Sequence, residues 1–118
     1  MSDLIVSEVV LGWPLQAEAA RVGNDWLVCI TGGCAHHIGS VSTAWPADSE
    51  PIVQTITVPG HRDNAVSERF ARVLAASLRS VVCVTCGIHY DGIDRSGIEA
   101  VFAASDRLLA RLTDLLAQ

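Results

Sequence analysis

Apolar residues in the first half of the chain recur in short runs separated by turn residues, which is typical of β-strands. In one run Gln16 and Glu18 alternate with alanines, the two-residue period of a strand with one covered face. The expected strands are Leu4–Leu11, Gln16–Val22, Trp26–Thr31, Ile38–Trp45 and Ile52–Val58. Trp13 and Pro14 interrupt the apolar pattern, as proline does at a strand end. Five strands within sixty residues favour an antiparallel meander.

The second half changes to a helical period. After Asp63, an expected N-cap, apolar residues recur at helical spacing from Val66 onward. The segment Val81–Ile88 is almost wholly apolar, as expected for a central strand covered on both faces. Ser96 and Glu99 then have the spacing of a capping box at the start of a long terminal helix. The pattern predicts an α+β fold: a single mixed, mostly antiparallel sheet of five to six strands, with two helices packed on one face.

Composition limits the class of protein and its partners. Half of the 118 residues are hydrophobic and 18% are charged, so we expect one domain with its own core over residues 1–118. The net charge is -5 and all eight basic residues are arginines, which disfavours a nucleic-acid partner and excludes lysine-based catalysis. The sequence contains neither an apolar stretch of membrane-spanning length nor an N-terminal secretory pattern. We therefore expect a cytoplasmic protein whose four cysteines are reduced thiols.

The four histidines lie in three loops that contain glycine. These loops span Gly32–Gly39, Pro59–Asp63 and Gly87–Gly92. Glycine allows the backbone to approach a ligand closely, so each loop is a candidate binding segment. If the loops share one edge of the sheet, imidazoles, Arg62 and Asp91 converge on one pocket. The alternative for any single histidine is an exposed or capping role.

Two kinds of ligand suit these loops. Three imidazoles, from His37, His61 and His89, provide the ligand type of a zinc or iron site. Asp91 adds a carboxylate, but no fixed sequence spacing supports the site. Arg62 and the following helix start can instead hold a phosphate through the guanidinium, free amides and helix dipole. An ordinary capped helix is the alternative at that place.

The spacing of Cys83 and Cys86 favours core packing over metal or redox chemistry. Residues three apart on a strand point to opposite faces, whereas a metal-binding C-x-x-C normally occupies a turn or a helix start. Cys34, beside His37 in its glycine loop, is the cysteine expected near the site. His36 is expected to point away from His37, because adjacent residues of an extended segment face opposite sides.

Three motifs stand in a fixed order across nearly the whole chain. They are Gly32-Gly33 followed by His37-Ile38-Gly39, then Pro59-Gly60-His61-Arg62-Asp63, then Gly87-Ile88-His89-Tyr90-Asp91. This combination resembles the prenylated-flavin chaperone-like (LpdD-type) family, whose members are associated with UbiD-type decarboxylases. The matching positions are Gly33, His37, Gly39, His61, Gly87, His89 and Asp91. This sequence has Gly92 where relatives tend to have Asn.

The resemblance implies a non-catalytic accessory protein. Such a protein would bind prenylated FMN and protect it or deliver it to a UbiD-type decarboxylase acting on aromatic or unsaturated acids. We expect the cofactor to contact Gly32, Gly33, His37, Gly39, His61, Arg62, His89 and Asp91. Trp13, Trp26, Trp45 and Tyr90 are available either as stacking surface for a flavin or as core.

Two alternatives of other classes remain open. One is a small metal-dependent enzyme in which His37, His61 and His89 hold a metal and Asp91 acts as base or fourth ligand. The other is a structural subunit that pairs through an exposed sheet edge. A small sheet with one helix-covered face must also cover its other face, so we expect a homodimer or larger homo-oligomer.

Overall fold

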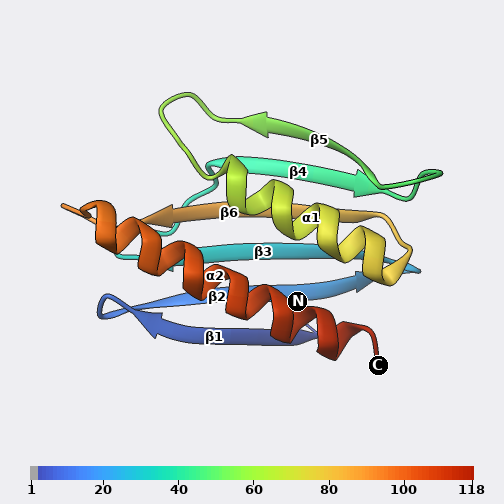
Figure 1. Cartoon of the computed structure of the whole chain (residues 1–118), viewed down its shortest axis with the longest axis horizontal. Coiled ribbons are helices and arrows are strands. Elements are labelled where there is room, and N and C mark those ends of the chain that lie inside the picture. The colour runs from blue at the N-terminus through green and yellow to red at the C-terminus, as the bar shows by residue number, and fades with distance from the viewer. Residues whose placement is uncertain (1–2) are drawn as a thin grey trace.

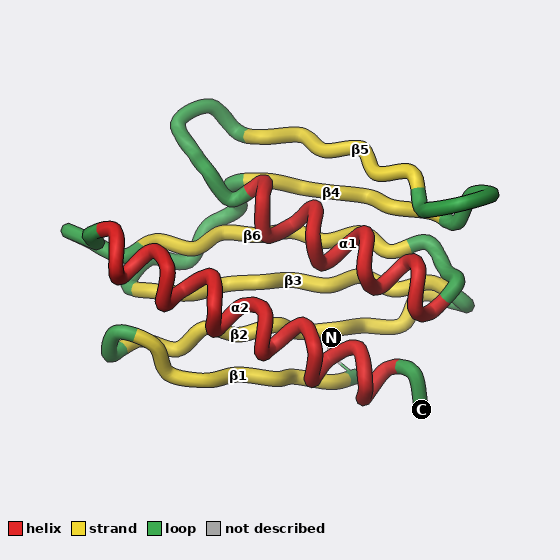
Figure 2. The backbone as a smooth tube through the Cα atoms, in the orientation of Figure 1, coloured by secondary structure: helices red, strands yellow, loops and turns green. Residues whose placement is uncertain are grey.

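The computed structural model describes residues 3–118 and contains six strands and two helices (Figures 1 and 2). The elements are β1 (Leu4–Val10), β2 (Trp13–Val22), β3 (Asp25–Gly33), β4 (Ser40–Trp45), β5 (Ile52–Thr57), α1 (Asn64–Leu78), β6 (Val82–His89) and α2 (Arg95–Leu116). The strands form one sheet in the order β1-β2-β3-β6-β4-β5. The predicted α+β class, with one mixed sheet and two helices, is confirmed.

The predicted meander of five strands is wrong after the third strand. β6 inserts between β3 and β4, parallel to β3 and antiparallel to β4. The chain returns through α1, which packs on β4 and β6, and brings β6, the last strand of the chain, to the centre of the sheet. Two contacts fix the start of this pairing: Trp26 N donates to Val81 O, and Val81 N donates to Asp25 Oδ1. β3 and β6 form the single parallel pair of this sheet, so their carboxyl ends lie at the same end of the sheet.

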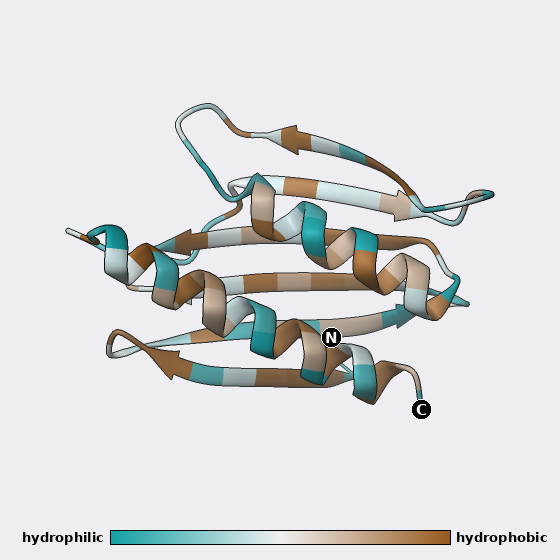
Figure 3. Cartoon of the chain, viewed as in Figure 1, coloured by the Kyte–Doolittle hydropathy of each residue, from teal (hydrophilic) through white to brown (hydrophobic). Residues whose placement is uncertain are grey.

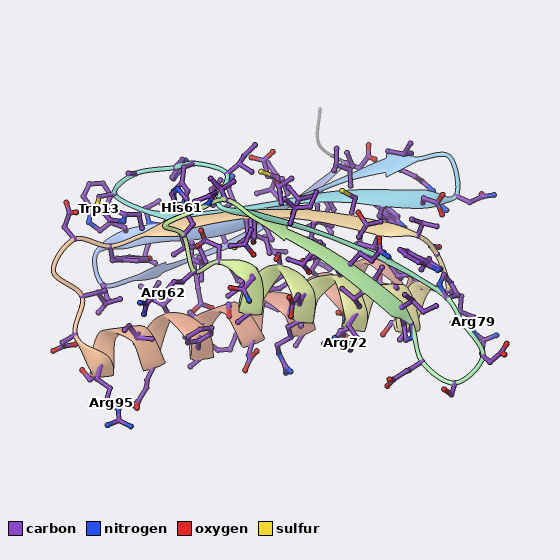
Figure 4. All side chains as sticks on the ribbon, turned by 90° about the horizontal axis from the view of Figure 1, so that it is seen from above. Trp13, His61, Arg62, Arg72, Arg79 and Arg95 are labelled. Atoms are coloured by element: carbon purple, nitrogen blue, oxygen red, sulfur yellow. The ribbon has the colours of Figure 1, made fainter. Side chains whose placement is uncertain are left out.

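Both helices cover the same face of the sheet, as the side view in Figure 4 shows. Figure 3 shows hydrophobic residues recurring along both helices and along the strands behind them. The largest fully buried apolar side chains of this layer are Phe70, Leu15, Ile30, Leu74, Leu108, Leu112, Val28, Val82 and Val84. Under α1 the core also holds hydroxyls, because Ser67 bonds Ser40 and Ser42 at 2.8 Å each. These hydroxyls satisfy one another, so their burial leaves no unpaired polar group among them.

Two of the element starts that differ from the sequence-based prediction have a clear physical reason. β2 begins at Trp13, so Pro14 lies within the strand. The pairing of β2 with β3 starts only at Leu15, so the missing N–H of Pro14 breaks no hydrogen bond to β3. The last helix begins at Arg95, not at a capping box of Ser96 and Glu99. Asp94 is its N-cap, because its carboxylate accepts a hydrogen bond of 2.8 Å from Gly97 N.

The other face of the sheet is not covered by any described element of the chain. One row across all six strands joins, by register, Ile5, Glu18, Cys29, Thr85, Val41 and Ile56. Ile5 and Ile56 are 53% and 73% exposed. The expected cover on both faces of β6 is thus present on the helix side only. Within residues 3–118, neither helix combines the length and the apolar content needed to cross a bilayer.

Candidate functional site

The three histidine loops meet at one end of the sheet. This end carries the carboxyl ends of β3 and β6, the turn between β1 and β2, and the starts of α1 and α2 (Figure 1). The parallel register pairs Gly33 with His89, so the loops that follow these residues leave the sheet side by side. The three loops thus share one end of the sheet, although of the imidazoles, Arg62 and Asp91 that would converge on one pocket, only Asp91 lines the cleft found there.

The first group of side chains in these loops is His37, His61 and Asp63. His37 Nε2 lies 3.1 Å from Asp63 Oδ2, and its Nδ1 lies 3.1 Å from the carbonyl oxygen of Ala35. The His61 ring stacks on the His37 ring with 4.6 Å between centroids. Both ring nitrogens of His37 thus face oxygen acceptors, which fixes the orientation of the imidazole and ties two loops together.

Asp63 has a different role from the predicted one. It does occupy the N-cap position of α1, but its side chain makes no capping hydrogen bond. The buried carboxylate instead accepts from Ile88 N on β6 at 3.1 Å and bonds His37 with its other oxygen. The Asp63 side chain therefore does not cap the first turn of α1. It joins the end of β6 to the loop before β4.

Two glycines, Gly39 and Gly87, leave room for the close contacts of His37 and Asp63. A Cβ on Gly39 would collide with the Asp63 carboxylate, and a Cβ on Gly87 would collide with the carbonyl group of His37. Neither glycine has a positive φ, so the requirement is space, not backbone conformation. Gly87, which matches the family pattern, thus lets the His37 loop lie directly on the end of β6.

The second group is Cys34, His89 and Asp91. Cys34 N donates to His89 O at 2.9 Å, which holds the turn after β3 against the end of β6. His89 Nε2 lies 2.8 Å from Asp91 Oδ1, and Cys34 Sγ lies 3.5 Å from Asp91 Oδ2. The hydrogen bond from His89, followed by that from Cys34, lowers the pKa of the exposed Asp91 carboxyl. The Cys34 thiol, the His89 imidazole and the Asp91 carboxylate therefore converge at this end of the sheet.

A cleft of about 430 Å³ opens next to this second group. Its wall includes Cys34 and Asp91, apolar side chains of Leu11, Trp13 and Ile93, and the start of α2. Trp13 is 48% exposed and offers an indole to the cleft. Its size is within the usual range for small-molecule sites.

Tyr90 gives this cleft an unusual polar group. The residue is 8% exposed and lines the cleft, and its hydroxyl is the single buried side-chain N or O atom of residues 3–118 without a hydrogen-bond partner. Burial, and then the nearby Cys34 thiol, raises the pKa of Tyr90, which keeps the hydroxyl a donor. Buried polar groups are nearly always paired, so this orphan, on a residue that lines the cleft, is a candidate contact for a ligand.

The remaining predicted residues are placed as follows. Gly32 is buried against Leu15, while Gly33 has a φ of 82° and lies on the backbone of His89. Arg62 is exposed, and Figure 4 shows it on the helix side of the sheet while His61 lies at the open-face side of the same end. His36 is exposed.

The histidines that were considered for one metal site fall into two groups. Among the described residues, the clusters of potential ligands are His37 with His61 and Asp63, and Cys34 with His89 and Asp91. Cys83 and Cys86 lie on opposite faces of β6, as predicted from their spacing. Cys86 is buried, and burial raises the pKa of its thiol, so it belongs to the core.

Sequence reasoning did not assign Asp63 to the site, and it offered Tyr90 only as stacking surface or core, not as a hydrogen-bond donor. Asp63 was assigned to helix capping because an aspartate before an apolar helical pattern usually caps it. The signal that could have placed it is its position two residues after His61, within the same glycine loop. No sequence signal indicates that the Tyr90 hydroxyl lacks a partner, because this depends on the packing around it.

Comparison with known proteins identifies the family. The family model described as "Prenylated flavin chaperone LpdD-like domain" matches residues 11–117, which include every loop of this end. The chain belongs to the LpdD-like chaperone family. It is 31% identical over 110 residues to Protein LpdD of Lactiplantibacillus plantarum, covering 89% of this chain and 79% of that protein. The family relationship supports an accessory, chaperone-type role for this LpdD-like chain.

A solved structure supports the fold alone. The chain superposes on a chain from the crystal structure of a novel chaperone complex for yeast 20S proteasome assembly with a TM-score of 0.52. The match covers 96% of this chain and 94% of that chain at 15% identity. The LpdD-like chain therefore shares an overall arrangement of strands and helices with a protein of very different sequence.

Proposed function

We propose that this LpdD-like protein binds prenylated FMN at the loop end of its sheet and delivers it to a UbiD-type decarboxylase. The observation that carries the proposal is the cleft beside Trp13, which is also lined by Tyr90, whose buried hydroxyl has no hydrogen-bond partner. A flavin needs an apolar surface for its ring system and a small number of polar contacts that orient it. The description of the matching family, which names a prenylated flavin, supports this cofactor over others.

Each part of the site has a role in this proposal. The Trp13 indole would stack on the ring system, and the Tyr90 hydroxyl would donate to a ring acceptor. Arg62 and the first-turn amides of α1, which Asp63 does not cap, lie outside the cleft lining but at the same end of the sheet, and they would hold the phosphate. The bound group would supply decarboxylation chemistry only after transfer, so the chaperone itself needs no catalytic residue.

An open, half-exposed cleft suits a carrier. The cleft is formed by loops and by the start of α2, and its aromatic wall remains half exposed at Trp13. A cofactor held there can be contacted by a partner protein before it leaves. A fully enclosed pocket would instead require the loops to open for every transfer.

Substitution of Tyr90 by Phe separates binding from stability. The substitution removes a buried hydroxyl without a partner, so we expect the free energy of unfolding of the cofactor-free protein to stay unchanged or to rise by about 1 kcal/mol. Binding of prenylated FMN, followed by quenching of tryptophan fluorescence under anaerobic conditions, should weaken about tenfold. Trp13→Ala should weaken it further, whereas Trp45→Ala, at the other end of β4, should not. Unchanged affinity in both Tyr90→Phe and Trp13→Ala would place the flavin elsewhere.

The uncovered face of the sheet supports a homodimer. In the row Ile5, Glu18, Cys29, Thr85, Val41 and Ile56, one residue of six is charged. A shallow groove of about 400 Å³ lies on β4 and β5 beside Val41 and Ile56. We propose that a second copy of the chain covers this face, because an apolar sheet surface of this extent is rarely left in water.

Charge placed on this face is expected to give a monomer. Leu27 is 43% exposed and neighbours Cys83 on the open face. Leu27→Glu should shift the molar mass measured by light scattering from dimer to monomer, because two copies would then bury facing carboxylates. Phe102→Glu is the control, because it changes a similarly exposed apolar residue that lies on α2. It should leave the molar mass unchanged. A monomeric wild-type protein at micromolar concentration would contradict the dimer.

A further inference from the structure

The Cys34, His89 and Asp91 group has the composition and the geometry of a divalent metal site. Its three donor atoms are a thiol sulfur, an imidazole nitrogen and a carboxylate oxygen, and all lie within 4.8 Å of one another. These are the ligand types that zinc takes from proteins. They come from two segments, the turn after β3 and the end of β6 with its following loop, which the parallel pairing of Gly33 and His89 holds together.

Two of the three donor pairs, each measured to a different oxygen of Asp91, lie near the separations that a tetrahedral ion requires. With Zn–S near 2.3 Å and Zn–O near 2.0 Å, sulfur and oxygen ligands of one ion lie about 3.5 Å apart. Cys34 Sγ and Asp91 Oδ2 lie 3.5 Å apart. Nitrogen and oxygen ligands lie about 3.3 Å apart, whereas His89 Nε2 and Asp91 Oδ1 are at the 2.8 Å of a hydrogen bond. The Asp91 side chain is 84% exposed, so the carboxylate is free to move by this half ångström.

The backbone around the sulfur is already fixed. Gly33 has a φ of 82° and contacts the His89 carbonyl so closely that a side chain would collide with it. Cys34 N then donates to the same carbonyl. These two features set the position of Cys34 relative to His89 before any ion binds, which lowers the ordering cost of binding.

The other group of potential ligands is less suited to an ion. The Asp63 carboxylate is buried and already bonds Ile88 N and His37, and His37 is held by Ala35 O as well. A metal there would have to replace hydrogen bonds that join β6 to two loops. The Cys34 group has no such duty, because its side chains bond chiefly to one another.

We propose that Cys34, His89 and Asp91 form a binding site for a thiophilic divalent cation such as Zn²⁺. Binding transfers the thiol proton of Cys34 to solvent, and the thiolate and the Asp91 carboxylate together balance the charge of the ion. Three protein ligands leave a fourth position open. Because Cys34 and Asp91 also line the cleft, this position adjoins the cleft and accepts water or an anionic group of a ligand placed there.

Titration of the flavin-free protein with Co²⁺ tests the site independently of the flavin proposal. A cysteine ligand gives Co²⁺ an intense thiolate-to-metal charge-transfer absorption, so we expect this absorption to saturate at one ion per chain. It should disappear in Cys34→Ser and persist in Cys29→Ser, a half-buried thiol on the open face. Displacement of the Co²⁺ by Zn²⁺ then gives the zinc affinity.

Two further variants locate the nitrogen ligand. His89→Ala should weaken Zn²⁺ binding at least tenfold, whereas His61→Ala, which changes the other group, should leave it unchanged. The absence of a charge-transfer absorption, or one that survives Cys34→Ser, would overturn the proposal. Loss of Zn²⁺ affinity in His61→Ala without loss in His89→Ala would overturn it as well. Binding of prenylated FMN is measured separately, so neither result decides the other.

Discussion

Asp63→Ala is expected to lower the free energy of unfolding by about 3 kcal/mol, with a fall of roughly 10 °C in Tm. The buried carboxylate accepts from Ile88 N and bonds His37 Nε2, so its removal leaves a buried amide and an imidazole without their acceptor. The His37 loop then loses its link to β6, and we expect prenylated FMN binding to fall with it. Chemical denaturation followed by circular dichroism measures the first effect.

Asp48→Ala is the matched control for this prediction. Asp48 is exposed in the loop between β4 and β5, at the opposite end of β4 from the site. Its removal should change the unfolding free energy by less than about 0.5 kcal/mol. If Asp63→Ala cost no more than Asp48→Ala, the carboxylate would not be the link between the loops, and the account of the site's rigidity would fail.

Gly87→Ala is expected to cost about 3 kcal/mol and to abolish prenylated FMN binding. The new methyl group would overlap the backbone carbonyl of His37, and a main-chain obstacle cannot turn aside as a flexible side chain does. The whole His37 loop must lift from the end of β6, which also separates His37 from Asp63. Unfolding and binding are measured on the same preparation.

Gly23→Ala separates this steric effect from the general cost of replacing a glycine. Gly23 has a φ of 62° in the turn between β2 and β3, with open space around its Cβ position. Backbone strain alone should cost about 1 kcal/mol there and leave binding unchanged. Equal losses in Gly87→Ala and Gly23→Ala would show that the close approach of the His37 loop has no special importance.

These two predictions are also coupled. Asp63 and Gly87 act on the same loop, so the double variant should lose less stability than the sum of the single losses. Independent contributions would instead add within about 0.5 kcal/mol. The double-mutant cycle therefore tests whether His37 is held by one network.

Periodicity predicted the elements well but could not predict their neighbours. The two-residue and helical periods located six strands and two helices, because burial of one face imposes those periods. The insertion of β6 between β3 and β4 depends on where α1 packs. The local sequence pattern does not determine where a helix packs. A meander and a split sheet place the same alternation on every strand, so the sequence allows both.

The location of the candidate site was predictable where it depends on residue types that have few structural roles. Histidines and glycines clustered in three loops indicated one end of the sheet, and the parallel pairing of Gly33 with His89 explains why they gather there. Asp63 was assigned to a cap because a local hydrogen bond is the usual partner for an aspartate at a helix start. Its real partners, His37 and Ile88, are at least 25 residues away in sequence, a separation that local rules do not reach.

The cofactor content of the protein produced together with a flavin prenyltransferase shows whether the chain carries prenylated FMN. Purified without oxygen, it should show flavin-type absorption and release a ligand with the mass of prenylated FMN, near one per chain. Cys83→Ser, away from the loops, should retain the ligand, and Tyr90→Phe with Trp13→Ala should lose it. A colourless protein that folds normally and releases no flavin would contradict the account.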